Sequence, residues 1–137
     1  RKCSRMTMVL DASAMLAYLR GEPGSHRVAE AITDGALMSA LNWAEVLSKV
    51  AEECQKPEEL AEQLQAQGIL GRAVEVVPMT AIDATIIARL RSSTRSAGLS
   101  PGDRACLALG MRLQLPVLTA DRIWSGLDLD VDVRLVR

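Results

Sequence analysis

The sequence has few aromatic residues, one histidine and three cysteines, and each shortage argues against a class of chemistry. Aromatic residues make up 2% of the 137 residues and phenylalanine is absent, so a base-stacking platform of the RRM or OB type is not expected. His26 is the only histidine, which leaves almost no material for Ser-His-Asp, Cys-His or His-ligated zinc chemistry. Cys3, Cys54 and Cys106 are far apart and form no CxxC pair. This favours reduced thiols in a cytoplasmic protein over a disulfide framework.

Neither charge nor hydropathy points to a nucleic acid or a membrane. The net charge is −1, without the basic excess that is typical of nucleic-acid-binding domains. No apolar run reaches transmembrane length, and no signal-peptide core follows the basic start RKCSRM. We therefore expect a cytoplasmic protein without membrane contact. Residues 8–136 would form one domain, and residues 1–7 an N-terminal extension or a cloning remnant.

Short apolar runs alternate with helical patterns along the chain. We expect strands at residues 8–10, 36–39, 73–77, 116–119 and 131–136. We expect helices at residues 13–20, 25–33, 41–54, 57–67, 80–97 and 101–113. This alternation predicts an α/β fold, with a parallel sheet covered by helices on both faces. The carboxyl ends of the strands and the N-termini of the helices then meet at one edge, where ligands bind in such folds.

Four carboxylates are expected at this edge. Two follow strands directly and two lie in the first turns of helices: Asp11, Asp121, Glu45 and Asp103. At about 5 Å apart, each pair would repel by roughly 3 kcal/mol at an effective dielectric of about 20. A cluster of oxygen ligands without His or Cys would be neutralised by Mg²⁺ or Mn²⁺.

Each carboxylate also has a purely structural explanation. Asp103 fits a capping box with Ser100. Glu45 has the same spacing from Asn42, and Asp121 can cap the turn that follows it. Helix caps do not need to meet one another, however, so capping explains each group singly but not the four together.

Three blocks of the sequence, MVLDASAMLAYL, SALNWAEVL and LSPGDRACLALGMRLQLPVLTADRIW, strongly resemble the PIN-domain ribonucleases, and within them the VapC-type toxins of type II toxin–antitoxin pairs. The third block is the most specific, and the resemblance extends from Met8 to Val136. It implies a three-layer α/β/α sandwich with a central parallel sheet of strand order 3-2-1-4-5. That order makes the strand at 73–77 an outer one, which removes Asp83 from the site although Asp83 follows this strand.

The resemblance also implies a site and a reaction. Carried over to this sequence, the catalytic and metal-binding quartet is Asp11, Glu45, Asp103 and Asp121, and the supporting polar residues are Ser13 and Thr119. The implied activity is a Mg²⁺- or Mn²⁺-dependent endoribonuclease that hydrolyses phosphodiester bonds of structured RNA such as tRNA. The implied partner is a VapB-type antitoxin, in a complex that contains a homodimer of the toxin.

Two surfaces near the site are candidates for contact with these partners. An apolar surface with Trp43 and Met15 or Leu16 would receive the antitoxin, unless these side chains are internal core or a homodimer seam. Four arginines would meet RNA phosphates, unless they are simply solvated cations: Arg89, Arg91, Arg95 and Arg104.

Two other functions are weighed against the ribonuclease. A haloacid-dehalogenase-type phosphatase also uses a strand-terminal aspartate. It needs a second Asp where this chain has Ser13, and a late lysine, whereas no lysine follows Lys56. A PIN-like scaffold that binds RNA or a partner without cleaving is disfavoured by the intact quartet.

Overall fold

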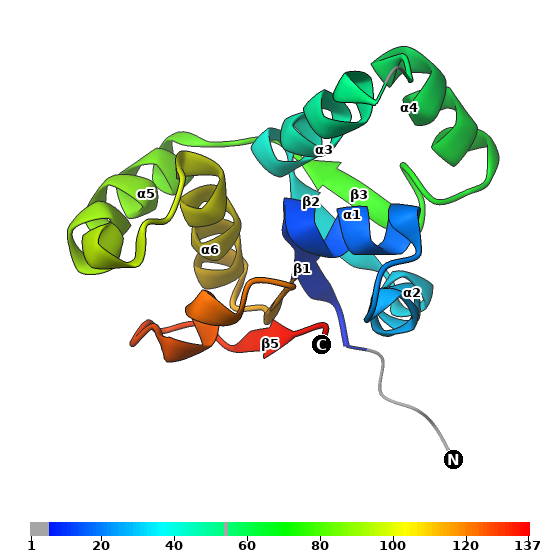
Figure 1. Ribbon diagram of the computed structural model, residues 1–137. Helices are drawn as coiled ribbons and strands as arrows, with labels where there is room; N and C mark the ends of the chain where they lie inside the picture. The colour runs from blue at the N-terminus through cyan, green and yellow to red at the C-terminus, as the bar shows by residue number, and fades with distance from the viewer. Residues whose placement is uncertain (1–5, 54) are drawn as a thin grey trace.

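A five-stranded parallel sheet organises the computed structural model, which describes residues 6–53 and 55–137 (Figure 1). The strands are β1 (Met8–Leu10), β2 (Ala36–Ser39), β3 (Val74–Val77), β4 (Val117–Thr119) and β5 (Val133–Leu135). Their order is β3-β2-β1-β4-β5, and every neighbouring pair is parallel. The predicted strand order is confirmed. Cys3, Cys54 and most of the expected N-terminal extension lie outside the described residues.

The predicted helices are all present, with small shifts at their ends. They are α1 (Ala12–Arg20), α2 (Ser25–Asp34), α3 (Ala40–Glu52), α4 (Pro57–Ala66), α5 (Ala81–Thr94) and α6 (Pro101–Leu113). Two short 3₁₀ helices follow α5 and β4, namely η1 (Arg95–Ala97) and η2 (Arg122–Gly126). No helix in the described ranges has the length and apolarity needed to cross a membrane.

The alternation of side chains along the strands produces three layers. On β1, Met8 and Leu10 pack into a core with α1, α2, α3 and α4, whereas Val9 packs into a second core with α5 and α6. Figure 1 shows these two groups of helices on either side of the sheet. The predicted α/β/α sandwich is confirmed.

Helix α6 packs on the central strands β1, β2 and β4, as its apolar sequence predicts. Every residue from Ala105 to Gly110 is buried. A Cβ atom at Gly110 would lie 2.5 Å from Cγ1 of Val117, so only glycine allows α6 to approach β4 this closely. Because the C-terminal part of α6 lies against the first residue of β4, the helix runs antiparallel to the strand and its N-terminus lies at the carboxyl edge of the sheet.

The apolar surface expected to receive an antitoxin is not a surface. Met15 is fully buried, and Leu16 and Trp43 are each 9% exposed within the core. The cause is packing around α1, which contacts strands β1 and β4 and is flanked by α2 and α3 on the same face of the sheet. The expectation of exposure was wrong, and the alternative that these side chains are core is correct.

Candidate active site

Asp11 is the first residue after β1 and also the N-cap of α1. Its Oδ1 accepts a hydrogen bond from the backbone N–H of Ala14 at 2.8 Å. The Thr119 hydroxyl donates to Oδ2 at 2.7 Å, and the Ser13 hydroxyl lies 2.8 and 2.9 Å from the two carboxylate oxygens. The side chain is therefore buried but well supplied with donors, and only 3% of the residue is exposed.

The two hydroxyls that bind Asp11 connect it to the end of β4. The Ser13 oxygen accepts from the backbone N–H of Ala120 at 2.9 Å, and the Thr119 oxygen accepts from the N–H of Asp121 at 3.0 Å. Because each hydroxyl accepts from the backbone, its proton is available for the carboxylate. Ser13 and Thr119 thus hold Asp11 and the Asp121 backbone in one network.

The environment of Asp11 disfavours its ionised form. Burial raises the pKa of Asp11 from 3.8 to about 6, despite hydrogen bonds from Thr119, Ala14 and Ser13 that lower it, and the nearby charge of Asp103 adds a smaller rise. A carboxylate of this kind is stabilised by any cation that reaches it.

Asp103 lies in the first turn of α6 and forms the predicted capping box with Ser100. The Ser100 hydroxyl accepts from the Asp103 N–H at 3.1 Å, and Oδ2 of Asp103 accepts from the Ser100 N–H at 2.9 Å. The structural explanation for this residue is therefore correct. It engages only one oxygen of a side chain that remains partly exposed.

Asn42 does not cap a helix, contrary to the capping box predicted with Glu45. The N-cap of α3 is Ser39, whose hydroxyl accepts from the Leu41 N–H at 3.2 Å, so Asn42 already lies inside the helix. Its Nδ2 donates at 2.9 Å both to Oε1 of Glu45 and to the carbonyl of Gly102. Asn42 thus ties Glu45 to the N-terminus of α6.

The position of Glu45 also depends on the absence of a side chain at Gly102. A Cβ atom built on Gly102 would collide with the carboxylate of Glu45. The sequence does not single out Asn42 and Gly102 as functional candidates, because a capping pattern explains Asn42 and Gly102 is a residue without a side chain in the first turn of α6.

Asp121 follows β4 and is the N-cap of η2, as its structural alternative predicts. Its Oδ1 accepts from the backbone N–H of Ile123 at 3.0 Å. The side chain is partly exposed, and its backbone is bound to Thr119. Asp121 therefore lies at the same edge as Asp11 and in the same hydrogen-bond network.

The charges of three of the four carboxylates act on one buried thiol. Burial raises the pKa of Cys106 well above its ordinary value, and the charges of Asp11, Asp103 and Glu45 raise it further. No ion pair within residues 6–53 and 55–137 includes any of the four acids. The edge thus carries negative charge that no described cation neutralises.

The four carboxylates do not form a complete set of metal ligands in their present conformations. Among the described residues, no group of three or more His, Cys, Asp or Glu side chains is close enough to hold a metal ion. The donors are nonetheless carboxylate oxygens without a counter-charge, which suits a hard divalent cation. Side-chain rotation at the partly exposed Glu45, Asp103 and Asp121 would be needed to gather them.

Asp83 is separated from these residues. It forms a capping box with Thr80 and an ion pair with Arg112, whose Nε lies 2.6 Å from Oδ1. Burial alone would raise the pKa of Asp83, but the hydrogen bonds from Arg112 and Thr80, together with the Arg112 charge, lower it below its ordinary value. This carboxylate follows the outer strand β3 and already has its cation.

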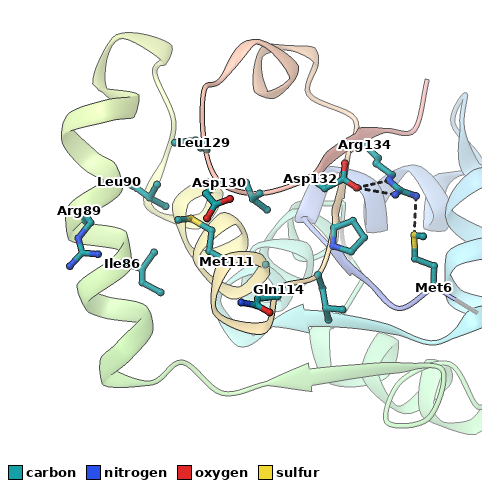
Figure 2. A pocket seen from close by; sticks show the side chains of 14 residues that line it. Met6, Ile86, Arg89, Leu90, Met111, Gln114, Leu129, Asp130, Asp132 and Arg134 are labelled. Atoms are coloured by element: carbon teal, nitrogen blue, oxygen red, sulfur yellow. Dashed lines mark hydrogen bonds and ion pairs between the residues drawn. The ribbon is translucent and has the colours of Figure 1, made fainter.

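The four arginines considered as RNA contacts do not lie on one surface. Arg91 and Arg104 line a pocket of about 440 Å³ beside the N-terminus of α6. Arg89 lines a larger pocket of about 830 Å³ at the opposite edge of the sheet, where Figure 2 shows it on α5 near Ile86 and Leu90. Arg95 lies exposed in η1.

Residues 8–128 match the family model of the PIN domain, and several solved structures have a similar fold. A toxin–antitoxin complex from Klebsiella pneumoniae has a TM-score of 0.73 at 16% identity, over 95% of this chain and 98% of that chain. DNA-bound VapBC from Salmonella typhimurium has a TM-score of 0.71 at 15% identity, over 96% and 99%. FitAcB from Neisseria gonorrhoeae has a TM-score of 0.65 at 24% identity, over 93% and 96%. No curated protein matches the sequence.

Proposed function

Because the chain belongs to the PIN domain family, as the match over residues 8–128 shows, we propose that it is a metal-dependent endoribonuclease and the VapC-type toxin of a toxin–antitoxin pair. The observation that carries the proposal is the placement of four carboxylates, without a described counter-charge, at the carboxyl edge of the sheet. The similar fold of the VapBC toxin–antitoxin structure from Salmonella typhimurium supports the toxin assignment.

The proposed site consists of Asp11, Glu45, Asp103 and Asp121, with Ser13 and Thr119 in support. Asp11 and Asp103 would hold Mg²⁺ or Mn²⁺ most directly, because the charge of Asp103 already acts on Asp11. When bound, the ion would supply a Lewis acid that activates water and offsets the charge of the scissile phosphate.

The remaining residues of the site have roles that follow from their contacts. Ser13 and Thr119 donate to Asp11 and so keep it oriented in its ionised form. Glu45 is fixed by Asn42 and would accept a proton from the attacking water. Asp121, partly exposed at the end of β4, would orient that water or the substrate.

The partners and the location follow from the same proposal. The substrate is structured RNA such as tRNA, which places the protein in the cytoplasm. A VapB-type antitoxin would inhibit the toxin, in a complex that contains a toxin homodimer. The core position of Trp43 and Met15 means that the antitoxin contacts other side chains than these.

The test is cleavage of labelled tRNA in the presence of Mn²⁺, with EDTA as the metal-free control. Wild-type protein should cleave and Asp11→Asn should not, whereas Asp128→Asn, an exposed acid outside the quartet, should cleave normally. Binding of tRNA without cleavage by the wild type would instead identify a non-cleaving PIN-like scaffold. Phosphatase activity without tRNA cleavage would favour the haloacid-dehalogenase type.

A further inference from the structure

A pocket of about 440 Å³ lies next to the acidic edge, between the N-termini of α3 and α6 and one face of α5. Leu41 and Pro101 form part of its wall. Each precedes a residue of the acidic site in the sequence, because Leu41 is followed by Asn42 and Pro101 by Gly102. The pocket and the carboxylates are therefore neighbours, and its size falls within the range of about 300–1,000 Å³ that is common for small-ligand pockets.

Arg104 enters this pocket in a fixed orientation. Its Nε donates to the hydroxyl of Thr94 at 2.9 Å. Thr94 is fully buried, and its own hydroxyl donates to the carbonyl of Leu90 at 2.7 Å. The Thr94 hydroxyl that holds Arg104 is neutral and binds only Nε. The guanidinium therefore keeps its charge, and its two terminal nitrogens keep their hydrogen-bond donors.

Arg91 supplies a second cation to the same pocket. Neither Arg91 nor Arg104 takes part in any ion pair found within residues 6–53 and 55–137. No Asp or Glu lines the pocket. Two guanidinium groups without acids beside a negatively charged site are suited to an anion that arrives with the substrate, because arginine binds phosphate through paired hydrogen bonds.

The rest of the pocket is apolar. Its other lining residues are Leu41, Met79, Ala84, Ile87, Ala88 and Pro101. An apolar wall with guanidinium groups at its side can pack against the face of an RNA base, which stacks on arginine as well as on aromatic rings.

We propose that this pocket binds one nucleotide of the RNA strand adjacent to the scissile phosphate, with Arg91 and Arg104 on its phosphates and the apolar wall against its base. This inference rests on the ribonuclease function proposed above and adds the residues that position the substrate.

A second copy of this chain is the other possible occupant, since Met79 and the neighbouring Ile82 are 41% and 61% exposed. A two-fold interface places the same patch on both sides. Here it would bring the arginines of both copies together with no lining acid to pair with them. Charge complementarity therefore favours RNA.

The test measures binding separately from cleavage. The affinity of fluorescein-labelled, unfractionated tRNA is measured by fluorescence anisotropy in EDTA, over a range of NaCl concentrations. Arg91→Gln and Arg104→Gln should each raise Kd by about threefold to tenfold. Each should also reduce the slope of log K against log[NaCl] by about 0.7, as expected for the loss of one phosphate contact on a single strand.

Two matched controls are an arginine elsewhere on α5 and a conservative change at Arg104. Arg89→Gln removes an arginine from α5 at the opposite pocket (Figure 2), and should change Kd less than twofold with an unchanged slope. Arg104→Lys keeps the charge but loses the paired guanidinium donors, so Kd should rise while the slope of log K against log[NaCl] stays unchanged. Arg91 is exposed, so Arg91→Gln tests the proposal even if a change at Arg104 disturbs folding.

The outcomes separate this inference from the proposed function. If wild type cleaves tRNA with Mn²⁺ but Arg91→Gln and Arg104→Gln bind like Arg89→Gln, the pocket inference is wrong and the ribonuclease stands. If binding shows the expected arginine dependence but neither the wild type nor any variant cleaves, the ribonuclease proposal fails and the pocket stands as an RNA-binding site only. Absence of tRNA binding by the wild type in EDTA would refute the pocket.

The second-copy alternative is tested with Ala88→Glu, which places an acid on the exposed wall of the pocket. The proposal predicts weaker tRNA binding and an unchanged sedimentation coefficient. A smaller sedimentation coefficient with unchanged tRNA affinity would assign the pocket to a homodimer interface and overturn the proposal.

Discussion

Replacing Asp11 with Asn should stabilise the metal-free protein at neutral pH. Burial raises the pKa of Asp11 from 3.8 to about 6, with a smaller contribution from the charge of Asp103. At about 1.4 kcal/mol per pH unit, this rise means that ionised Asp11 costs about 3 kcal/mol of folding free energy. Asparagine has nearly the same shape and cannot ionise.

The sign of the effect gives it a characteristic pH dependence. The folded protein holds the proton of Asp11 more tightly than the unfolded chain does. The stability that this group contributes is therefore fully present below pH 3.8 and is lost as the pH rises through about 6. About 1.4 kcal/mol of the loss should fall between pH 5 and pH 7.5.

The substitution should preserve the helix cap and most of the local hydrogen bonds. The amide oxygen of Asn can still accept from the Ala14 N–H, as Oδ1 does now at 2.8 Å. Its Nδ2 can donate to one of the hydroxyl oxygens of Thr119 and Ser13. One of these hydroxyls can then donate to the other, since their oxygens lie 3.2 Å apart, but the remaining hydroxyl proton loses its carboxylate acceptor, and this cost does not change with pH.

The assay is urea unfolding of wild type and Asp11→Asn at pH 5 and pH 7.5, both in EDTA. The stability of the variant relative to wild type should increase by about 1.4 kcal/mol between the two pH values. Adding Mn²⁺ at pH 7.5 should stabilise wild type and leave the variant nearly unchanged, because only the wild type binds the ion well. A stability difference that is the same at both pH values would refute the assigned pKa and its cause.

Further expectations concern the neighbouring residues. The Asp103→Asn variant can keep the helix cap. Its melting temperature in EDTA should therefore equal or exceed that of the wild type, while its stabilisation by Mn²⁺ should be smaller. The Asp103→Ala variant should lose about 0.5–1.5 kcal/mol of unfolding free energy with or without metal. Gly102→Ala should abolish most Mn²⁺-dependent tRNA cleavage, whereas Gly126→Ala, which meets open space, should not. Asp83→Asn should lower the free energy of unfolding by about 1.5–3 kcal/mol, seen as a lower urea midpoint, for the lost charged hydrogen bonds to Arg112, with normal cleavage by the folded protein. Equal inactivity of folded Asp83→Asn and Asp11→Asn would mean that the quartet is wrongly assigned.

The architecture could be predicted from the sequence because the strands and helices have strong, distinct periodicities. The strand order could not, since periodicity does not say which strands are neighbours; it came from the family resemblance. Helix ends depend on local contacts that the periodicity does not show. The helix predicted for residues 80–97 ends at Thr94 and continues as a 3₁₀ turn, and the Thr94 hydroxyl is bound to the Leu90 carbonyl, a local competition that helical spacing does not reveal.

Two features of the site depend on tertiary contacts and were not predictable. Asn42 and Glu45 have the spacing of a capping box, but the same spacing also joins two side chains on one face inside a helix. Ser39, three residues earlier, takes the cap instead. Similarly, the burial of Trp43 is decided by the helices packed around it, which the sequence of α3 alone does not specify.

For these acids, capping a helix and binding a metal ion are compatible roles. Asp11, Asp103 and Asp121 each use a carboxylate oxygen to accept a backbone N–H at the start of a helical segment. Helices that follow or precede parallel strands start at the carboxyl edge, so a capping acid is brought to the edge where ligands bind. The caps thus hold Asp11, Asp103 and Asp121 at the edge of the proposed site. This is why the Asp→Asn variants, which can keep a capping oxygen and lose only the charge, distinguish the two roles better than alanine does.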